Sequence, residues 1–303
     1  MRREWRLDIV RAMDALETLE IASWNGPFGD ADAARAVDAL ESGRVLFFPR
    51  LPFTLRTEEH ALLTPELSSG RAKNISLDPS GRLKHQAGAQ QESALLQAMM
   101  QRFASDAVSL VEGLFPGYAA SLERARTSYR PVEIAGRKYS PIHDDTRLHV
   151  DAFPTRPMRG RRILRLFSNV HPGATPRVWN VGEPFADMAA KILPRVKEPP
   201  ALVNWLRAAT LQTRGLRSRY DDLMMGLHDN AKLDMDYQHA TRKTEIAFPP
   251  GSTWLCYTDQ VMHAALSGQF VLEQTFHLDV AAMAQPSRAP IRVLEKMTGR
   301  TLA

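Results

Sequence analysis

Apolar residues recur at helical spacing in three stretches of the first 125 residues, which predicts a mainly helical N-terminal part. The expected helices cover Asp8–Leu19, Ala31–Glu41 and Gln90–Leu114, and a short strand is expected over Val45–Phe48. The arginine-rich start in front of the first helix would suit an anionic membrane face. A helix packed on the domain is the commoner outcome and is the one that we favour.

After about residue 125 the pattern changes to short β-rich runs separated by turns that carry proline and glycine. Such spacing predicts a sandwich or a jelly roll. A helical insert is expected within it, and the polar tract Arg214–Arg242 is a candidate lid or substrate loop. The expected strands are Arg147–Phe153, Ile163–Val170, Arg177–Val181, Glu245–Phe248, Thr253–Tyr257, Met262–Leu266 and Phe270–Val280, and the helices of the insert are Glu183–Ile192 and Leu202–Gln212.

No linker divides the chain, so a single domain over residues 1–303 is expected. Its parts are the helical region 1–125, a jelly-roll core over 126–282 with an insert around 183–242, and a tail over 283–303. Helices of the N-terminal region are expected to pack on the core, which makes the fold class α+β.

Composition narrows the possible functions. Cys256 is the only cysteine, which excludes an internal disulfide and a multi-cysteine zinc site. No apolar run is long enough to cross a bilayer, and the charged N-terminus is unlike a signal peptide, so a cytoplasmic protein, free or peripheral on a membrane, is expected.

The net charge of +5 comes with 31 arginines and 8 lysines. Codon usage in a GC-rich genome and recognition of anions both account for this ratio. The charge forms no basic stripe, so no nucleic-acid partner is expected.

The segment Asp144–Phe153 carries the candidate chemistry. On a strand, side chains at i and i+2 share a face, so His149 and Asp151 can bind one metal ion together. A third ligand must come from elsewhere, and His263, delivered by a hairpin, has the best context. His239 and His277 are the other candidates. Two histidines and one carboxylate leave three positions of an octahedral Fe(II) open, enough for a keto acid and dioxygen.

Three runs then resemble the Kdo hydroxylase family: DDTRLHVDAFP (144–154), GRRILRLFSNVHP (160–172) and RVWNVGEPF (177–185). The resemblance implies a double-stranded β-helix (a cupin-like jelly roll) and a dioxygenase that uses Fe(II), 2-oxoglutarate and dioxygen. It implies hydroxylation of 3-deoxy-D-manno-octulosonic acid (Kdo) at carbon 3 on Kdo-lipid A, beside the inner membrane, in lipopolysaccharide modification. It assigns His149, Asp151 and His263 as metal ligands.

Binding of the far carboxylate of 2-oxoglutarate is the open point of this resemblance. Many relatives place a cation about ten residues after the distal histidine, whereas Gln269–Gln274 carries none. Arg162 and Arg165 are the alternatives, and an ideal strand directs only one of them inward.

Residues around the triad have two interpretations each. Asp144, Asp145 and Arg147 form either a network around the metal or a turn with a surface salt bridge. Asn169 and Trp179 line the pocket, or are a strand-end amide and a core indole.

Two other functions remain open at this stage. One is a 2-oxoglutarate hydroxylase of a protein or another small molecule, which would have an identical metal site. The other is a non-catalytic, cupin-like sugar-binding protein that has kept the barrel.

Overall fold

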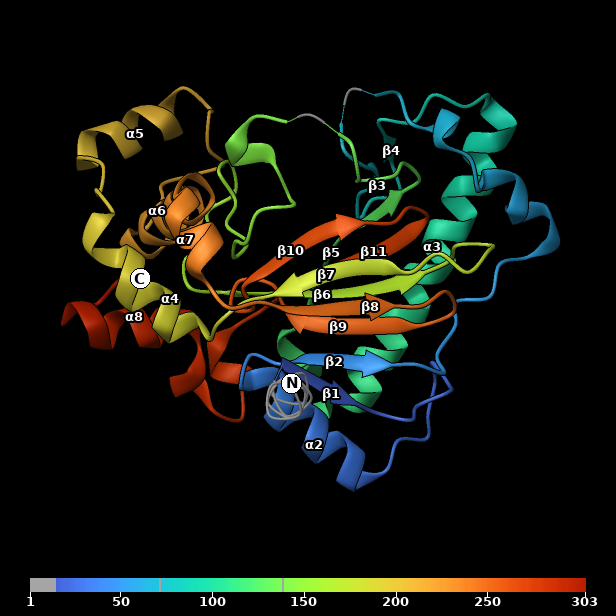
Figure 1. Ribbon diagram of the computed structural model, residues 1–303, viewed down its shortest axis with the longest axis horizontal. Helices are drawn as coiled ribbons and strands as arrows, with labels where there is room; N and C mark the ends of the chain where they lie inside the picture. Colours follow the sequence, from blue (N-terminus) through green and yellow to red (C-terminus); the bar gives the residue numbers. More distant parts are fainter. Residues whose placement is uncertain (1–14, 71, 138) are drawn as a thin grey trace.

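Two facing β-sheets form the centre of the molecule (Figure 1). The computed structural model describes residues 15–303 except 71 and 138. The large sheet has eight strands in the order β1-β2-β9-β6-β11-β5-β3-β4, and the small sheet has three in the order β10-β7-β8. This two-sheet arrangement is the predicted jelly roll.

In the large sheet, the central strands β9, β6 and β11 come from the second half of the chain, and strands from the first half lie on both sides of them. Pairing between neighbours is antiparallel except for β1 and β2, which are parallel. The strands are β1 (Leu16–Thr18), β2 (Val45–Phe48), β3 (Ile75–Leu77), β4 (Leu83–Lys84), β5 (Glu123–Arg130), β6 (Arg162–Asn169), β7 (Arg177–Val181), β8 (Thr244–Phe248), β9 (Thr253–Tyr257), β10 (His263–Ser267) and β11 (Val271–Leu278).

An aromatic core fills the space between the sheets. The Trp254 ring stacks on Phe248 with centroids 4.1 Å apart and on Phe167 at 5.3 Å, and Trp179 meets Trp254 edge-on at 5.8 Å. Both faces of the large sheet are covered, so β9 and β11 are buried along their whole length. The sequence of β9 is accordingly almost entirely apolar, whereas β11 buries four polar side chains, Glu273, Gln274, Thr275 and His277.

Helix α3 (Gln90–Leu114) covers the opposite face of the large sheet, together with α2 (Asp30–Glu41). Its buried residues, among them Met99, Phe103 and Leu110, recur at the helical period that predicted it. The boundaries of α3 and of β2, β7 and β9 agree with the prediction residue for residue.

The other helices gather at one end of the sheets (Figure 1). The tract 214–242 was expected as a polar lid or loop, but it is largely helical because Ser218 and Asp234 cap two helices. The helices at this end are α4 (Phe185–Ile192), α5 (Ala201–Ala209), α6 (Arg219–Leu233), α7 (Met235–Ala240) and α8 (Pro290–Thr298). Within the described part of the chain, none of them combines the length and apolarity that a bilayer crossing needs.

Two further predictions of secondary structure were wrong. Residues 16–18, expected in the first helix, form β1 because they pair with β2; the part of that helix before residue 15 lies outside the described residues. The segment Arg147–Phe153 is not a regular strand. It makes a single bridge to β10, at His149, and α7 occupies the place of its next neighbour.

Candidate metal centre

A reciprocal pair of backbone hydrogen bonds joins His149 to His263. The His149 amide donates to the His263 carbonyl at 3.0 Å, and the His263 amide donates back at 2.9 Å. Directly bridged residues on antiparallel segments bring their side chains close together, and the two imidazole centroids lie 4.6 Å apart. The fold therefore joins two residues that are far apart in the sequence.

Asp151 completes a cluster with these two histidines. One ligand atom of each residue, an imidazole nitrogen or a carboxylate oxygen, lies within 4.8 Å of those of the other two, and the Nε2 of His149 is 3.8 Å from Oδ1 of Asp151. All three side chains are nearly or largely buried. This is the two-histidine, one-carboxylate set typical of non-haem Fe(II) sites, so the donor set fits the ion implied by the sequence.

The Nδ1 atom of each imidazole contacts a nearby carbonyl. His149 Nδ1 is 2.8 Å from the Arg147 oxygen, and His263 Nδ1 is 2.9 Å from the Val261 oxygen. In the tautomer that donates this bond, Nε2 keeps its lone pair for a metal, and the ring orientation is fixed. Trp179 stacks on the other face of His263 at 5.1 Å. That contact fixes the ring further and places Trp179 both in the core and beside the site.

Gln238 of α7 holds the His149 segment in its extended form. Its side-chain oxygen accepts from the Leu148 amide at 2.9 Å, and its nitrogen donates to the Leu148 carbonyl at 2.9 Å. The Asp151 amide donates to the Thr258 carbonyl at 2.7 Å. A buried side chain thus satisfies the backbone groups that a neighbouring strand would normally satisfy. Sequence reasoning missed Gln238, since a lone glutamine carries no such signal.

Arg165 lies beside the triad. Its guanidinium is 3.2 Å from Asp151 and 3.5 Å from Glu273, and Glu273 in turn accepts a hydrogen bond from Arg130 Nε at 3.0 Å. Glu273 stands ten residues after His263, where a cation was expected. Arginines on β5 and β6, which flank β11, supply the positive charge there instead.

Arg162 points to the opposite face of β6 and does not reach the triad. Its guanidinium is fully buried, pairs with Asp259 at 2.8 Å, donates to Gln260 at 2.6 Å and covers the Tyr257 ring. The expectation that at most one of the two arginines points toward the metal is therefore met, and Arg162 is engaged elsewhere.

Burial and charge set the protonation of the cluster. Burial, reinforced by His263, holds the pKa of His149 well below its usual range. Burial alone would raise the pKa of Asp151, but Arg165 and the two imidazoles outweigh it and lower that pKa. At neutral pH the cluster presents two neutral imidazoles and one carboxylate, the forms that bind a metal.

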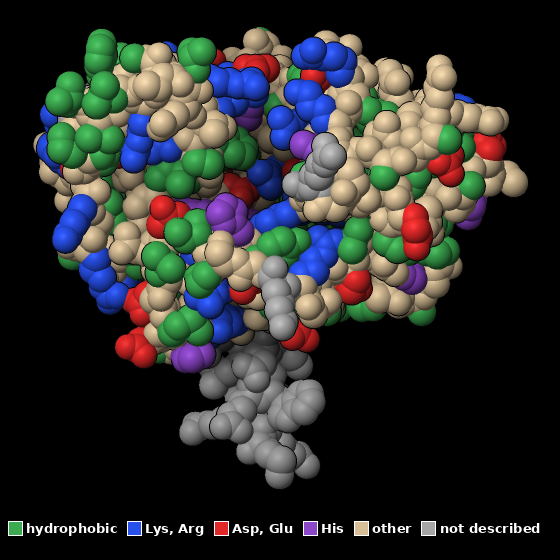
Figure 2. Space-filling view, turned by 90° about the horizontal axis from the view of Figure 1, so that it is seen from above, with side chains coloured by type: hydrophobic (Ala, Val, Ile, Leu, Met, Phe, Trp, Pro, Cys, Tyr) green, Lys and Arg blue, Asp and Glu red, His purple; other side chains and the backbone are tan. Residues whose placement is uncertain are grey.

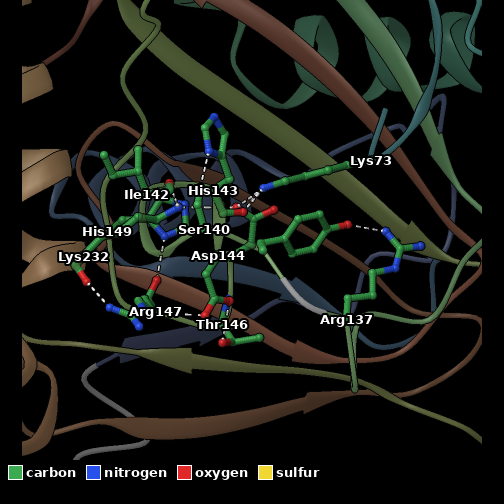
Figure 3. Close-up of polar contacts among 12 residues, drawn as sticks. Lys73, Arg137, Ser140, Ile142, His143, Asp144, Thr146, Arg147, His149 and Lys232 are labelled. Carbon is green, nitrogen blue, oxygen red and sulfur yellow. Dashed lines mark hydrogen bonds and ion pairs between the residues drawn. The ribbon is translucent and has the colours of Figure 1, made fainter. Parts of the chain in front are cut away.

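The loop before His149 forms a polar network that Figure 3 shows in detail. Asp145 accepts from Lys73 at 2.7 Å and from Lys232 at 3.4 Å, and Lys232 also donates to the Ile142 carbonyl at 3.0 Å. Asp144 is instead a turn residue: it accepts from Thr146 at 2.7 Å and lies 3.5 Å from Arg147. Asp145 therefore belongs to a polar network beside the site, and Asp144 to a turn with a salt bridge.

A hollow of about 220 Å³ adjoins Arg165 and Phe153. Among the described residues, its lining carries five guanidinium groups and one carboxylate, that of Glu273. Such a lining is suited to an anionic ligand. Its arginines are Arg126, Arg130, Arg156, Arg165 and Arg214.

Arg177 is a second buried cation that the sequence did not single out. It donates to the Gly268 carbonyl at 2.8 Å, and among the described residues it forms no ion pair and its Nε has no partner. Burial, together with Arg130, lowers its pKa to about 9. It lies two residues before Trp179 on β7, on the same face of that strand. Glu133 acts on this guanidinium from beyond salt-bridge distance. A buried guanidinium with no directly paired carboxylate is the kind of group that binds an incoming anion.

The remaining candidates lie outside the cluster. His239 is at the exposed end of α7. His277 is buried near Glu123, with Nδ1 3.7 Å from its carboxylate. Asn169 bonds to the backbone at Phe248 and His171, as a strand-end amide does. His228 of α6 was not anticipated; its ring centroid lies 5.4 Å from that of His149.

Comparison with known proteins gives a consistent result. Residues 24–301 match the family model described as 3-deoxy-D-manno-oct-2-ulosonic acid (Kdo) hydroxylase. Crystal structures of the Kdo hydroxylase KdoO, a non-heme Fe(II) alphaketoglutarate dependent dioxygenase, are also similar. The complex with alphaketoglutarate and Fe(III) has 45% identity and a TM-score of 0.92, and the cobalt(II) complex has 46% and 0.93. Each match covers 95% of this chain and 97% of the other. No curated protein sequence matches.

Proposed function

This chain belongs to the Kdo hydroxylase family of Fe(II)- and 2-oxoglutarate-dependent dioxygenases, and from this premise we propose that it hydroxylates Kdo at carbon 3 on Kdo-lipid A. The observation that carries the proposal is the convergence of His149, Asp151 and His263 beside an arginine-lined hollow. Of the functions left open by the sequence, the family favours an enzyme acting on Kdo.

The metal ligands are proposed to be His149, Asp151 and His263. Bound there, Fe(II) together with 2-oxoglutarate and dioxygen would supply the oxidising chemistry of the hydroxylation. The protein's part is to hold three ligands on one side of the ion and leave the other side open. The Arg165 guanidinium keeps the Asp151 carboxylate ionised and oriented.

For 2-oxoglutarate we propose Arg177 as the receptor of the far carboxylate, with Arg165 as the other candidate. Arg165 is already neutralised by Asp151 and Glu273, whereas Arg177 has no carboxylate within salt-bridge distance among the described residues. An anion placed there would form a charge-assisted pair away from water.

The arginine-lined hollow is the proposed substrate pocket. Kdo is an acidic sugar, and lipid A carries phosphates, so the substrate presents several anionic groups near the reacting carbon. Guanidinium groups bind such oxygens in bidentate fashion and orient them. The pocket can therefore fix the target C–H bond relative to the metal, which is the main contribution that positioning makes to rate. We also propose that the enzyme acts at the cytoplasmic face of the inner membrane, since a glycolipid substrate would be held there.

Succinate release dependent on both Fe(II) and Kdo-lipid A tests the function. We expect it to vanish in His149→Ala and Asp151→Ala, and to persist in His239→Ala, whose side chain is outside the cluster. Mass spectrometry of the product should show one added oxygen on the Kdo residue. Full turnover in both ligand variants would reject the ligand assignment, and release without Kdo-lipid A would reject the substrate.

A further inference from the structure

Helix α5 is inside-out. The side chains of Leu202, Trp205 and Leu206 are 66%, 57% and 47% exposed, whereas the polar Asn204 is buried and bonds to Asp222. An ordinary surface helix directs its apolar residues inward and its polar residues outward. Hydrophobic burial within the chain gives no reason for apolar residues at positions 202, 205 and 206, because their side chains contact water.

The segment after α5 continues the apolar surface. Leu211 is 88% exposed and Leu216 is 50% exposed. Leu211 also has φ +58°, a left-handed conformation that leucine rarely adopts. Half of the ten exposed large apolar residues of the described chain fall within these fifteen positions, namely Leu202, Trp205, Leu206, Leu211 and Leu216. A patch this concentrated marks an interaction surface.

The charge of the same segment identifies the kind of partner. Residues 201–220 contain no Asp or Glu but four arginines: Arg207, Arg214, Arg217 and Arg219. Arg217 is largely buried against Asp222. An apolar face on a segment whose own charged residues are all positive has the composition of a segment that lies in the interface of an anionic membrane. A protein partner would be expected to face mixed charges instead.

The apolar surface lies next to the proposed substrate pocket. The Arg214 amide donates to the Thr155 carbonyl at 2.8 Å, and both residues line the hollow beside Arg165. Figure 2 shows apolar side chains gathered at the α5 end of the face and Lys and Arg side chains around a central depression. A surface that rested on lipid here would hold the pocket close to the headgroups.

We propose that Leu202, Trp205, Leu206, Leu211 and Leu216 insert into an anionic lipid bilayer, with the neighbouring arginines on its phosphates. The proposal rests on the proposed function, since a lipid-linked substrate gives the contact its purpose. With this surface on the membrane, a glycolipid headgroup can enter the arginine-lined pocket while its acyl chains stay in the bilayer.

Co-sedimentation with vesicles of phosphatidylethanolamine and phosphatidylglycerol tests the surface directly. The variant Leu202→Ser/Trp205→Ser/Leu206→Ser should bind about tenfold or more weakly than the unchanged protein, because three side chains no longer transfer into lipid. A matched control, Leu233→Ser/Met297→Ser, removes exposed apolar residues elsewhere and should bind normally. Binding should also weaken with added salt, since arginines contribute.

Activity separates this proposal from the proposed function. The triple variant should turn over Kdo-lipid A normally in detergent micelles but slowly in vesicles. The proposed membrane surface would be overturned if the triple variant bound vesicles as well as the unchanged protein, or if the unchanged protein bound no vesicles. Absence of turnover by the unchanged protein on micellar Kdo-lipid A would overturn the function instead and leave the binding result standing.

Discussion

The guanidinium of Arg165 lies 3.2 Å from the carboxylate of Asp151, a proposed metal ligand. The same guanidinium is 3.5 Å from Glu273, which Arg130 also contacts. Positive and negative groups thus alternate from the triad to the arginine-lined pocket. Through these contacts, the ionisation of Asp151, a proposed metal ligand, is coupled to the charges of the residues that would bind the substrate.

Replacing Arg165 should weaken metal binding as well as stability. In Arg165→Met, Asp151 and Glu273 lose a buried countercharge, and the free energy of unfolding should fall by about 3 kcal/mol. Retention of Mn(II) or Fe(II), measured on the folded protein, should fall too.

Arg162→Met is the matched control for this variant. It also breaks a buried ion pair, with Asp259, but should leave metal and 2-oxoglutarate affinity unchanged. Arg177→Met should raise the Kd for 2-oxoglutarate with metal retained. If Arg177→Met left the Kd for 2-oxoglutarate unchanged, Arg165 would become the proposed receptor of its far carboxylate.

Gln238→Ala should destabilise the His149 segment. The Leu148 amide and carbonyl would lose their partner in a buried environment, which should cost about 2 to 4 kcal/mol. Thermal unfolding and metal retention measure the two effects. His239→Ala, on the neighbouring exposed position, should change neither, and a Gln238→Ala protein as stable as the original would show that water replaces the amide.

His277 should make stability depend on pH. Burial, with Arg156 adding to it, lowers the pKa of His277 from 6.5 to about 4. As pH falls below 6.5, the unfolded chain takes up a proton that the folded protein does not, so stability decreases from pH 7 toward pH 4.

Between pH 7 and 5 this contribution is about 2 kcal/mol. Denaturant titrations at the two pH values should therefore show a smaller decrease for His277→Gln than for the unchanged protein. Equal decreases would mean that folding does not lower the pKa of the imidazole.

Cys256 should be inert in the native protein. Burial between the sheets raises the pKa of its thiol, and the side chain has no exposed surface. A thiol reagent such as DTNB should label it only at the rate at which the protein opens, whereas the denatured chain should react at once with one equivalent. Rapid labelling of the native protein would indicate that β9 opens locally.

Much of the fold could be predicted from the sequence, because in many elements the spacing of apolar residues matches the positions that are buried. In α3 the apolar period of a helix continues for 25 residues, and in β9 a short apolar run ends at turns. The first predicted helix was wrong over residues 16–18, since pairing with β2 overrode a short local pattern. In the tract 214–242, α6 buries Tyr220, Leu223, Met224, Leu227 and Ala231 at helical spacing, but the many charged and polar residues between them made the tract look like a loop.

The site, like the fold, has parts that the local sequence predicts and parts that depend on tertiary neighbours. The i, i+2 spacing predicted that His149 and Asp151 lie together, and they do. His263 was chosen because a hairpin was expected to deliver it; it joins the cluster, but β9 and β10 lie in different sheets and do not pair as a hairpin. The roles of Gln238 and Glu273 depend on which strands and helices are neighbours, which local sequence does not encode. Arg177 could have been noticed as a charged residue at an inward position of a strand, two residues from Trp179.

The two backbone hydrogen bonds between His149 and His263 fix the separation of their Cα atoms, and the Nδ1–carbonyl contacts fix the rings. Their spacing is therefore a property of the polypeptide, present with or without an ion. An ion that binds here would therefore meet two histidine ligands already at their final separation, and its loss would leave that separation unchanged.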